Sequence, residues 1–163
     1  MIRPDMMVLC AVLAAAPAAA DPLADMNGDW RGTGWAREVP GGTEEAVRCR
    51  LTNVYDGAAA TLTVTGRCAA AGRKIDLSGT MTAEPGTDRL TGRWSNPDGP
   101  GSTGISGMVR NDIVAFTFRA TDGATGRNLA QNVEWQVAPD KLRLRSTDRT
   151  DPDIMMSNID FTR

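Results

Sequence analysis

Apolar and polar residues alternate on both sides of a turn signal in the first half of the chain. The turn is Asp56-Gly57-Ala58-Ala59, and the segments beside it pair as an antiparallel hairpin. One face of this hairpin is mostly apolar and carries Cys49, Leu51, Asn53, Tyr55, Leu62, Val64, Gly66 and Cys68. The other face is mostly polar and carries Arg48, Arg50, Thr52, Thr61, Thr63, Thr65 and Arg67. This alternation predicts a sheet with one buried and one solvated face.

Cys49 and Cys68 face each other in this register, which the hydrophobic pattern sets independently of the two cysteines. Facing side chains on one side of an antiparallel pair lie close together. We therefore predict a disulfide between Cys49 and Cys68, and with it an oxidising compartment.

Three further turn signals repeat the same rhythm along the chain. A turn at Pro85-Gly86 is expected to pair Met81 with Leu90. The other two turns and the pairs expected around them are Asn111-Asp112 (Val109 with Val114, Gly107 with Phe116, Ile105 with Phe118) and Pro139-Asp140 (Val137 with Leu142, Trp135 with Leu144, Val133 with Ser146).

Additional strands are expected near residues 30–38 and 157–163, which brings the number to about ten. No segment repeats apolar residues at helical spacing for three turns. Consecutive strands at hairpin distance favour a meander, and a meander protects its edges most completely by closing. The sequence predicts an all-β protein, an antiparallel up-and-down meander closed into a barrel of about eight to ten strands. Residues 21–163 form its single domain, with irregular segments at 96–101, 122–128 and 148–153.

The first twenty residues have the pattern of a secretory signal peptide. Met1-Ile2-Arg3 is a positive start, residues 6–16 are apolar, and Ala18-Ala19-Ala20 is an A-x-A cleavage site before Asp21. The apolar run is shorter than the roughly 20 residues that a transmembrane helix needs. Lipid attachment at Cys10 is the alternative, and it is disfavoured because almost no apolar core precedes that cysteine.

Net charge and composition exclude some classes of partner and favour a location outside the cytoplasm. The predicted signal peptide carries one Arg and one Asp, so its removal leaves the net charge at −2. Nucleic acid and anionic membrane surfaces call for a basic patch, so we expect no nucleic-acid partner. No second segment reaches transmembrane length, so we expect no membrane insertion of the mature chain. A short signal and the absence of any Asn-x-Ser/Thr site favour a bacterial periplasmic or secreted protein.

The residues do not assemble a recognisable catalytic or metal-binding motif. The chain has no His, which excludes Ser-His-Asp and Cys-His catalysis and His-based zinc sites. Carboxylates at 148–153 and around Asp98 do not have the spacing of a calcium loop. We expect no catalytic residues, no metal and no cofactor; a small hydrolase or isomerase using a carboxylate pair remains the third-ranked alternative.

Gly28-Asp29-Trp30 in the first strand resembles the Gly-x-Trp signature of the calycin superfamily, which includes lipocalins, fatty-acid-binding proteins and avidins. In that family the Trp packs at the closed end of an up-and-down barrel, covered by a basic residue from the last strand. The resemblance implies that Arg163, which shares a strand face with Ile159 and Phe161, covers Trp30 at the barrel closure.

Function depends on whether the inward aromatics fill the barrel or line a cavity, and the sequence leaves both open. We predict a non-enzymatic binding protein for a small apolar or aromatic molecule. The expected ligand-binding residues are Asn53, Tyr55, Trp94, Phe116 and Trp135, with the ligand away from the Trp30 end. The alternative is an interaction protein whose loops contact an envelope protein or inhibit a secreted enzyme.

Overall fold

The computed structural model describes residues 21–96, 101–121 and 126–163. The predicted signal peptide, its cleavage motif and Cys10 lie outside the described residues. Residues 97–100 of the predicted irregular segment 96–101, and residues 122–125 of the segment 122–128, also lie outside the described residues.

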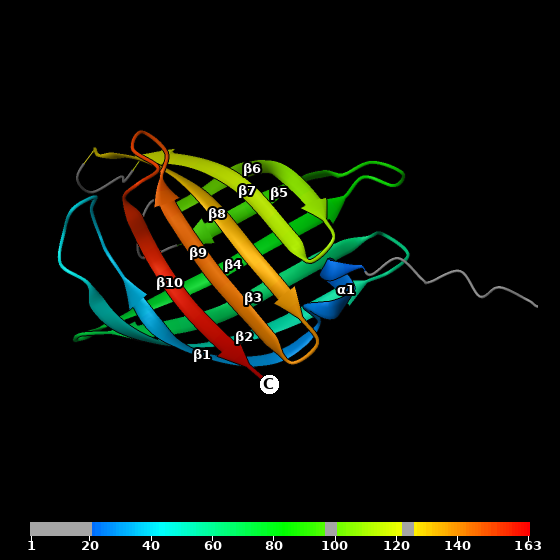
Figure 1. The fold of residues 1–163 in the computed structure, drawn as a ribbon, viewed down its shortest axis with the longest axis horizontal. Helices are drawn as coiled ribbons and strands as arrows, with labels where there is room; N and C mark the ends of the chain where they lie inside the picture. The colour runs from blue at the N-terminus through cyan, green and yellow to red at the C-terminus, as the bar shows by residue number, and fades with distance from the viewer. Residues whose placement is uncertain (1–20, 97–100, 122–125) are drawn as a thin grey trace, which may run out of the picture.

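The described chain forms one short helix and ten strands (Figure 1). The elements are α1 (Pro22–Asp25), β1 (Gly28–Ala36), β2 (Glu45–Asp56), β3 (Thr61–Ala70), β4 (Arg73–Ala83), β5 (Arg89–Asn96), β6 (Gly101–Arg110), β7 (Ile113–Thr121), β8 (Asn128–Ala138), β9 (Lys141–Asp148) and β10 (Met155–Thr162).

The ten strands form one closed antiparallel barrel in which every strand pairs with its neighbours in sequence, and β1 pairs with both β2 and β10. The predicted all-β meander barrel is confirmed, at the upper end of the expected strand number. Closure leaves no unpaired edge strand. The alternation that predicted the strands appears as buried and exposed positions along β2 and β3.

Three of the four predicted hairpin registers are confirmed. Cys49 faces Cys68 and the two form a disulfide, as predicted. The turn at residues 111–112 pairs Val109 with Val114. The turn at residues 139–140 likewise gives the expected facing residues along β8 and β9.

The register predicted around Pro85-Gly86 is wrong by two residues, because Met81 faces Gly92 and not Leu90. Thr87 N–H donates to the carbonyl of Glu84 (3.2 Å), and Gly86 has a φ of 75°. This is a type II turn, with Pro85 and Gly86 as its two central residues. The twist of a type II turn does not match that of the two strands, so the loop is two residues longer than the predicted two-residue loop. The faces are unchanged since a shift of two preserves the alternation.

Helix α1 was not predicted, because a single turn is too short to show helical periodicity. The carboxylate of Asp21 accepts hydrogen bonds from the N–H groups of Leu23 (3.1 Å) and Ala24 (3.4 Å). Pro22 fits the first helical turn, where no N–H is needed. Leu23 and Met26 are completely buried, so α1 covers one end of the barrel (Figure 1).

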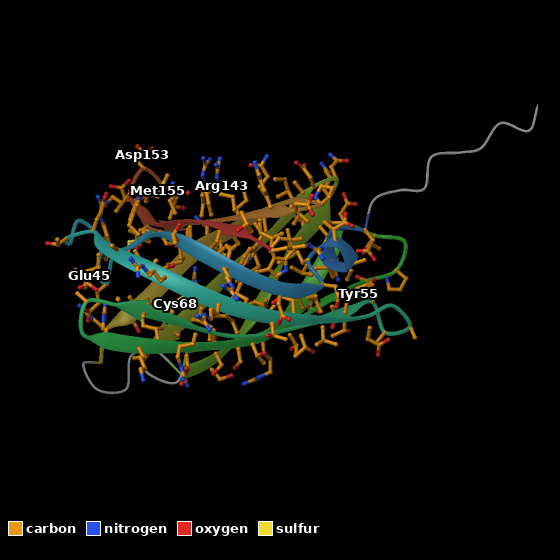
Figure 2. All side chains as sticks on the ribbon, turned by 90° about the horizontal axis from the view of Figure 1, so that it is seen from below. Glu45, Tyr55, Cys68, Arg143, Asp153 and Met155 are labelled. Atoms are coloured by element: carbon orange, nitrogen blue, oxygen red, sulfur yellow. A yellow bond between two sulfur atoms is a disulfide. The ribbon has the colours of Figure 1, made fainter. Side chains whose placement is uncertain are left out.

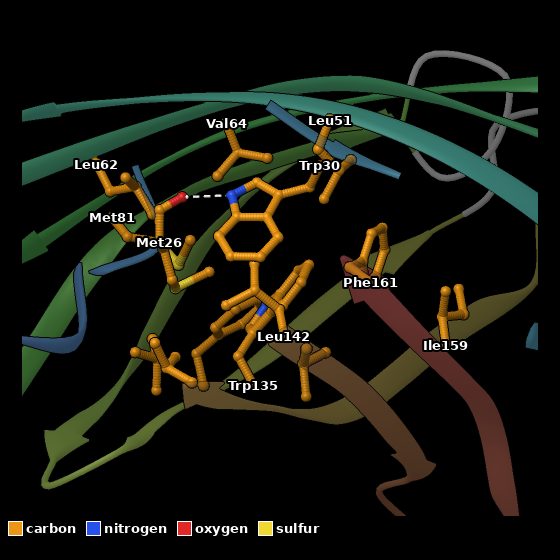
Figure 3. Packing of buried hydrophobic residues seen from close by; sticks show 14 of the residues in the cluster. Met26, Trp30, Leu51, Leu62, Val64, Met81, Trp135, Leu142, Ile159 and Phe161 are labelled. Atoms are coloured by element: carbon orange, nitrogen blue, oxygen red, sulfur yellow. Dashed lines mark hydrogen bonds between the residues drawn. The ribbon is translucent and has the colours of Figure 1, made fainter. Parts of the chain in front are cut away.

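The α1 half of the barrel is filled by side chains (Figure 3). Trp30, Trp135 and Phe161 are each about 1% exposed, and the rings of Trp135 and Phe161 lie 5.6 Å apart. The indole N–H of Trp30 donates to the carbonyl of Met26 (2.9 Å), which fastens the helix to this core.

Candidate functional site

The two ends of the barrel differ, and the α1 end is closed by polar as well as apolar contacts. Asn53 is buried and donates from Nδ2 to the carbonyl of Met26 (2.9 Å). The Tyr55 hydroxyl donates to Asp21 Oδ2, and this hydrogen bond, together with partial burial, raises the pKa of Tyr55 to about 12. The two side chains therefore hold α1 at both ends, Tyr55 at the N-cap residue Asp21 and Asn53 at the C-cap residue Met26.

Arg163 completes this closure. Its guanidinium carbon lies 4.6 Å from the centroid of the Trp30 ring. Its Nη2 donates to the carbonyl of Asp25 (3.0 Å) and its Nε to the carbonyl of Pro139 (3.1 Å). The contact that the Gly-x-Trp resemblance implied is present, and it ties α1 to the turn between β8 and β9.

A cavity of about 400 Å³ occupies the opposite end of the barrel, called the cavity end below. Its walls come from inward positions near the ends of the strands, and they are mainly apolar. The apolar side chains include Val47, Ile75, Leu77, Trp94, Phe118 and Leu129. A volume of this size lies within the range that small-molecule sites occupy.

Trp94 and Phe118 give the cavity an aromatic wall. Trp94 is held from one side by Phe116, whose ring centroid is 5.6 Å away. From the other side it lies over Gly79, where a Cβ atom would come within 2.5 Å of the indole. The glycine thus makes space for the ring.

The part of the wall formed by β8, β9 and β10, which begins beside Phe118, carries polar groups. Ser146 and Ser157 are 4% and 9% exposed, and their hydroxyl oxygens lie 2.7 Å apart. Gln131 also lines the cavity, and its side chain makes no hydrogen bond within the described part of the chain. The cavity therefore combines apolar walls with a few uncharged hydrogen-bonding groups.

Among the residues that the structure describes, the charged side chains that line the cavity lie at its rim, near the ends of β1, β2, β4 and β8. Arg73 pairs with Glu45 (2.9 Å) and Glu38 (3.4 Å), and Arg127 lies 3.7 Å from the same Glu38. Arg37 pairs with Glu44 at 2.6 Å. The rim thus places acidic side chains beside three of its basic ones.

The structure places the five predicted ligand-binding residues in different parts of the barrel. Trp94 lines the cavity, and Phe116 supports Trp94 from behind. Trp135 belongs to the packed core. The expected position of Tyr55 and Asn53, away from the Trp30 end, is wrong.

The reason is strand direction. β1 starts at the α1 end with Gly28, so β2, which is antiparallel to it, must finish there; Gly28 faces Asn53. Figure 2 shows Glu45 and Tyr55 at opposite ends of the molecule. Trp94 lies near the end of β5, three strands further on, and therefore at the cavity end.

The sequence prediction missed the polar wall of the cavity. Ser146 was placed opposite Val133 on an inward face, and the structure has that pair. A serine and a glutamine at inward positions of strands that are otherwise apolar inside were the available signal. These positions do not by themselves indicate a site, because the sequence does not show which end of the barrel is hollow.

No group of three or more His, Cys, Asp or Glu side chains that could hold a metal ion occurs among the described residues. Residues 21–96, 101–121 and 126–163 also contain no helix long and apolar enough to cross a bilayer.

Fold and cavity together define the class: a ten-stranded antiparallel β-barrel, packed and capped by a short helix at one end and hollow at the other. Comparisons of the sequence with models of known protein families and with curated proteins find no match.

Proposed function

We propose that this protein is an exported, non-enzymatic binding protein that holds a small apolar or aromatic molecule in the cavity. The observation that carries the proposal is the division of the barrel into a packed half and a hollow half. Protein interiors are normally close-packed. A cavity of about 400 Å³ bounded by Trp94 and Phe118 departs from that rule, which supports a binding role for it. Apolar walls with a few polar groups are the usual design of a small-molecule site.

The proposal includes the location and the structural relationship. A disulfide persists in oxidising compartments, which supports a periplasmic or secreted protein. Up-and-down topology, and a Trp30 indole covered by Arg163 from the chain end, support a calycin-type barrel. The absence of His from the sequence and the bonding of Cys49 to Cys68 support binding over catalysis.

The test uses N-phenyl-1-naphthylamine, an uncharged aromatic probe whose fluorescence rises in an apolar site. We expect saturable binding to the purified protein. Ala120→Phe places a ring inside the cavity, and we expect it to weaken probe binding about tenfold. A loss of this size corresponds to the burial of roughly two fewer CH₂ groups of the probe. Ala115→Phe is the matched control on the same strand, because Ala115 lies on the outer face.

A probe that binds the wild type and both variants equally would show that the cavity is not the site. A complete lack of probe binding, together with native mass spectrometry that finds no co-purified small molecule, would contradict the proposal. That result would favour the alternative, in which loops at a barrel end contact an envelope protein or inhibit a secreted enzyme.

A further inference from the structure

We propose that the ligand is an electrically neutral aromatic molecule with a carbonyl or hydroxyl oxygen, which is bound by Gln131 and by the Ser146–Ser157 pair. This inference rests on the proposed function and names the ligand chemistry of the same cavity.

The first argument is the unused hydrogen-bonding capacity of the polar wall. Two serine hydroxyls carry two protons, and their mutual hydrogen bond (2.7 Å) uses one of them. The other proton has no acceptor among the described residues. Ser146 is only 4% exposed, and a polar group so buried normally has its hydrogen bonds satisfied. A ligand oxygen would supply the missing acceptor.

The second argument is the position of Gln131. Its Cα faces that of Phe118 on β7, and its neighbour two residues along, Val133, faces Ser146. Gln131 and Ser146 are thus diagonal neighbours on the inner face, about 7–8 Å apart at the backbone. Side chains at that spacing can donate to one oxygen between them, and the ring of the ligand then lies against Phe118.

The third argument concerns charge. Every charged side chain that lines the cavity in the described residues lies within two residues of a strand end, as at Arg37, Arg73 and Arg127. Three basic side chains of the rim already have glutamate partners. A carboxylate placed beside Ser146 would be buried without a cation, which is strongly unfavourable. The site therefore selects a neutral polar group over an anion.

The test compares three naphthalene derivatives of nearly the same shape by equilibrium dialysis at pH 7. They are 2-acetonaphthone, which carries a neutral carbonyl, 2-ethylnaphthalene, which has no polar atom, and 2-naphthoate, which is anionic. We expect 2-acetonaphthone to bind about tenfold more tightly than either of the others, the value of one hydrogen bond.

Two variants assign the preference to the polar wall. Gln131→Leu and Ser146→Ala should each lower the affinity for 2-acetonaphthone by about three- to tenfold and leave that for 2-ethylnaphthalene unchanged or higher. The unchanged affinity for the hydrocarbon also shows that the variant is folded. Gln136→Leu and Ser106→Ala are matched controls, since both residues are exposed on the outer face.

Equal binding of 2-acetonaphthone and 2-ethylnaphthalene would overturn this inference and leave the proposed function standing. Tightest binding of 2-naphthoate would also overturn it and would assign recognition to the basic rim. Failure of all three compounds to bind would overturn both the inference and the proposed function.

Discussion

The guanidinium of Arg163, at the last position of the chain, lies over the indole of Trp30 in the first strand, 4.6 Å from the ring centroid. The same guanidinium donates to the carbonyl of Asp25 at the end of α1 and to that of Pro139 in the turn between β8 and β9. One side chain thus joins the helix, a turn and the two strands at which the barrel closes.

Replacing Arg163 should loosen the α1 end. Arg163→Met keeps the length of the side chain but removes the charge and both hydrogen bonds. We expect the free energy of unfolding to fall by about 1–2 kcal/mol, measured by urea denaturation. Arg145→Met is the control, because Arg145 is exposed on the outer face of β9. An equal effect of the two substitutions would mean that the contact with Trp30 contributes nothing specific.

The glycines beneath the aromatic rings provide the second prediction. A Cβ atom on Gly32 would overlap the ring of Phe161, whereas the nearest heavy atom to a Cβ on Gly104 is 4.0 Å away. Gly32→Ala should lower the free energy of unfolding by about 1–3 kcal/mol through overpacking. Gly104→Ala should leave it unchanged or raise it, because alanine loses less backbone entropy than glycine on folding. Thermal denaturation of both variants tests the contrast, and equal effects would argue against it.

The disulfide provides the third prediction. The chain between Cys49 and Cys68 closes a loop with a sequence separation of 19. In the chain-entropy account, the double variant Cys49→Ala/Cys68→Ala should lose about 3 kcal/mol of unfolding free energy in urea. Denatured protein that lacks residues 1–20 should react with no thiol reagent before reduction and with two equivalents afterwards. Two reactive thiols without reduction would contradict the bond.

The fold was predictable to the extent that local alternation and short turns determine it. The register at Cys49 and Cys68 follows from a one-faced apolar pattern, since a slip of one residue would reverse every side chain. The register around Pro85-Gly86 was missed because alternation cannot detect a slip of two residues. Only the turn geometry decides between such registers, and the loop was assumed to be two residues long.

The site was less predictable, because it depends on which half of the barrel is filled. Inward positions look alike along the sequence, whether they pack into the filled core, as Leu51 does near Trp30, or line the cavity, as Leu77 does. Strand direction was available from the meander and would have separated Tyr55 from Trp94. The one-turn helix that fills the α1 end could not be predicted from the sequence. Its only local signals are a capping Asp21 and the following Pro22, and one turn is too short to show helical periodicity.

The last prediction concerns Tyr55, the only tyrosine of the chain, whose ionisation can be followed by absorbance near 295 nm without interference from another phenol. Its hydrogen bond to Asp21 raises its pKa to about 12, against about 10 in the unfolded chain. Because the folded pKa is the higher one, the stabilisation is complete below pH 10 and is lost as the pH rises through 12. Tyr55→Phe should lower the free energy of unfolding by about 1 kcal/mol at pH 7 and remove this part of the alkaline destabilisation.

Two further variants test the cause of the shift. Asp21→Asn should return the pKa of Tyr55 toward 10, whereas Asp56→Asn, which alters only the weakest contribution to the shift, should change it little. A midpoint near pH 10 in the native wild-type protein would show that Asp21 does not hold the hydroxyl, and that α1 is fastened by Asn53, Trp30 and Arg163 without it.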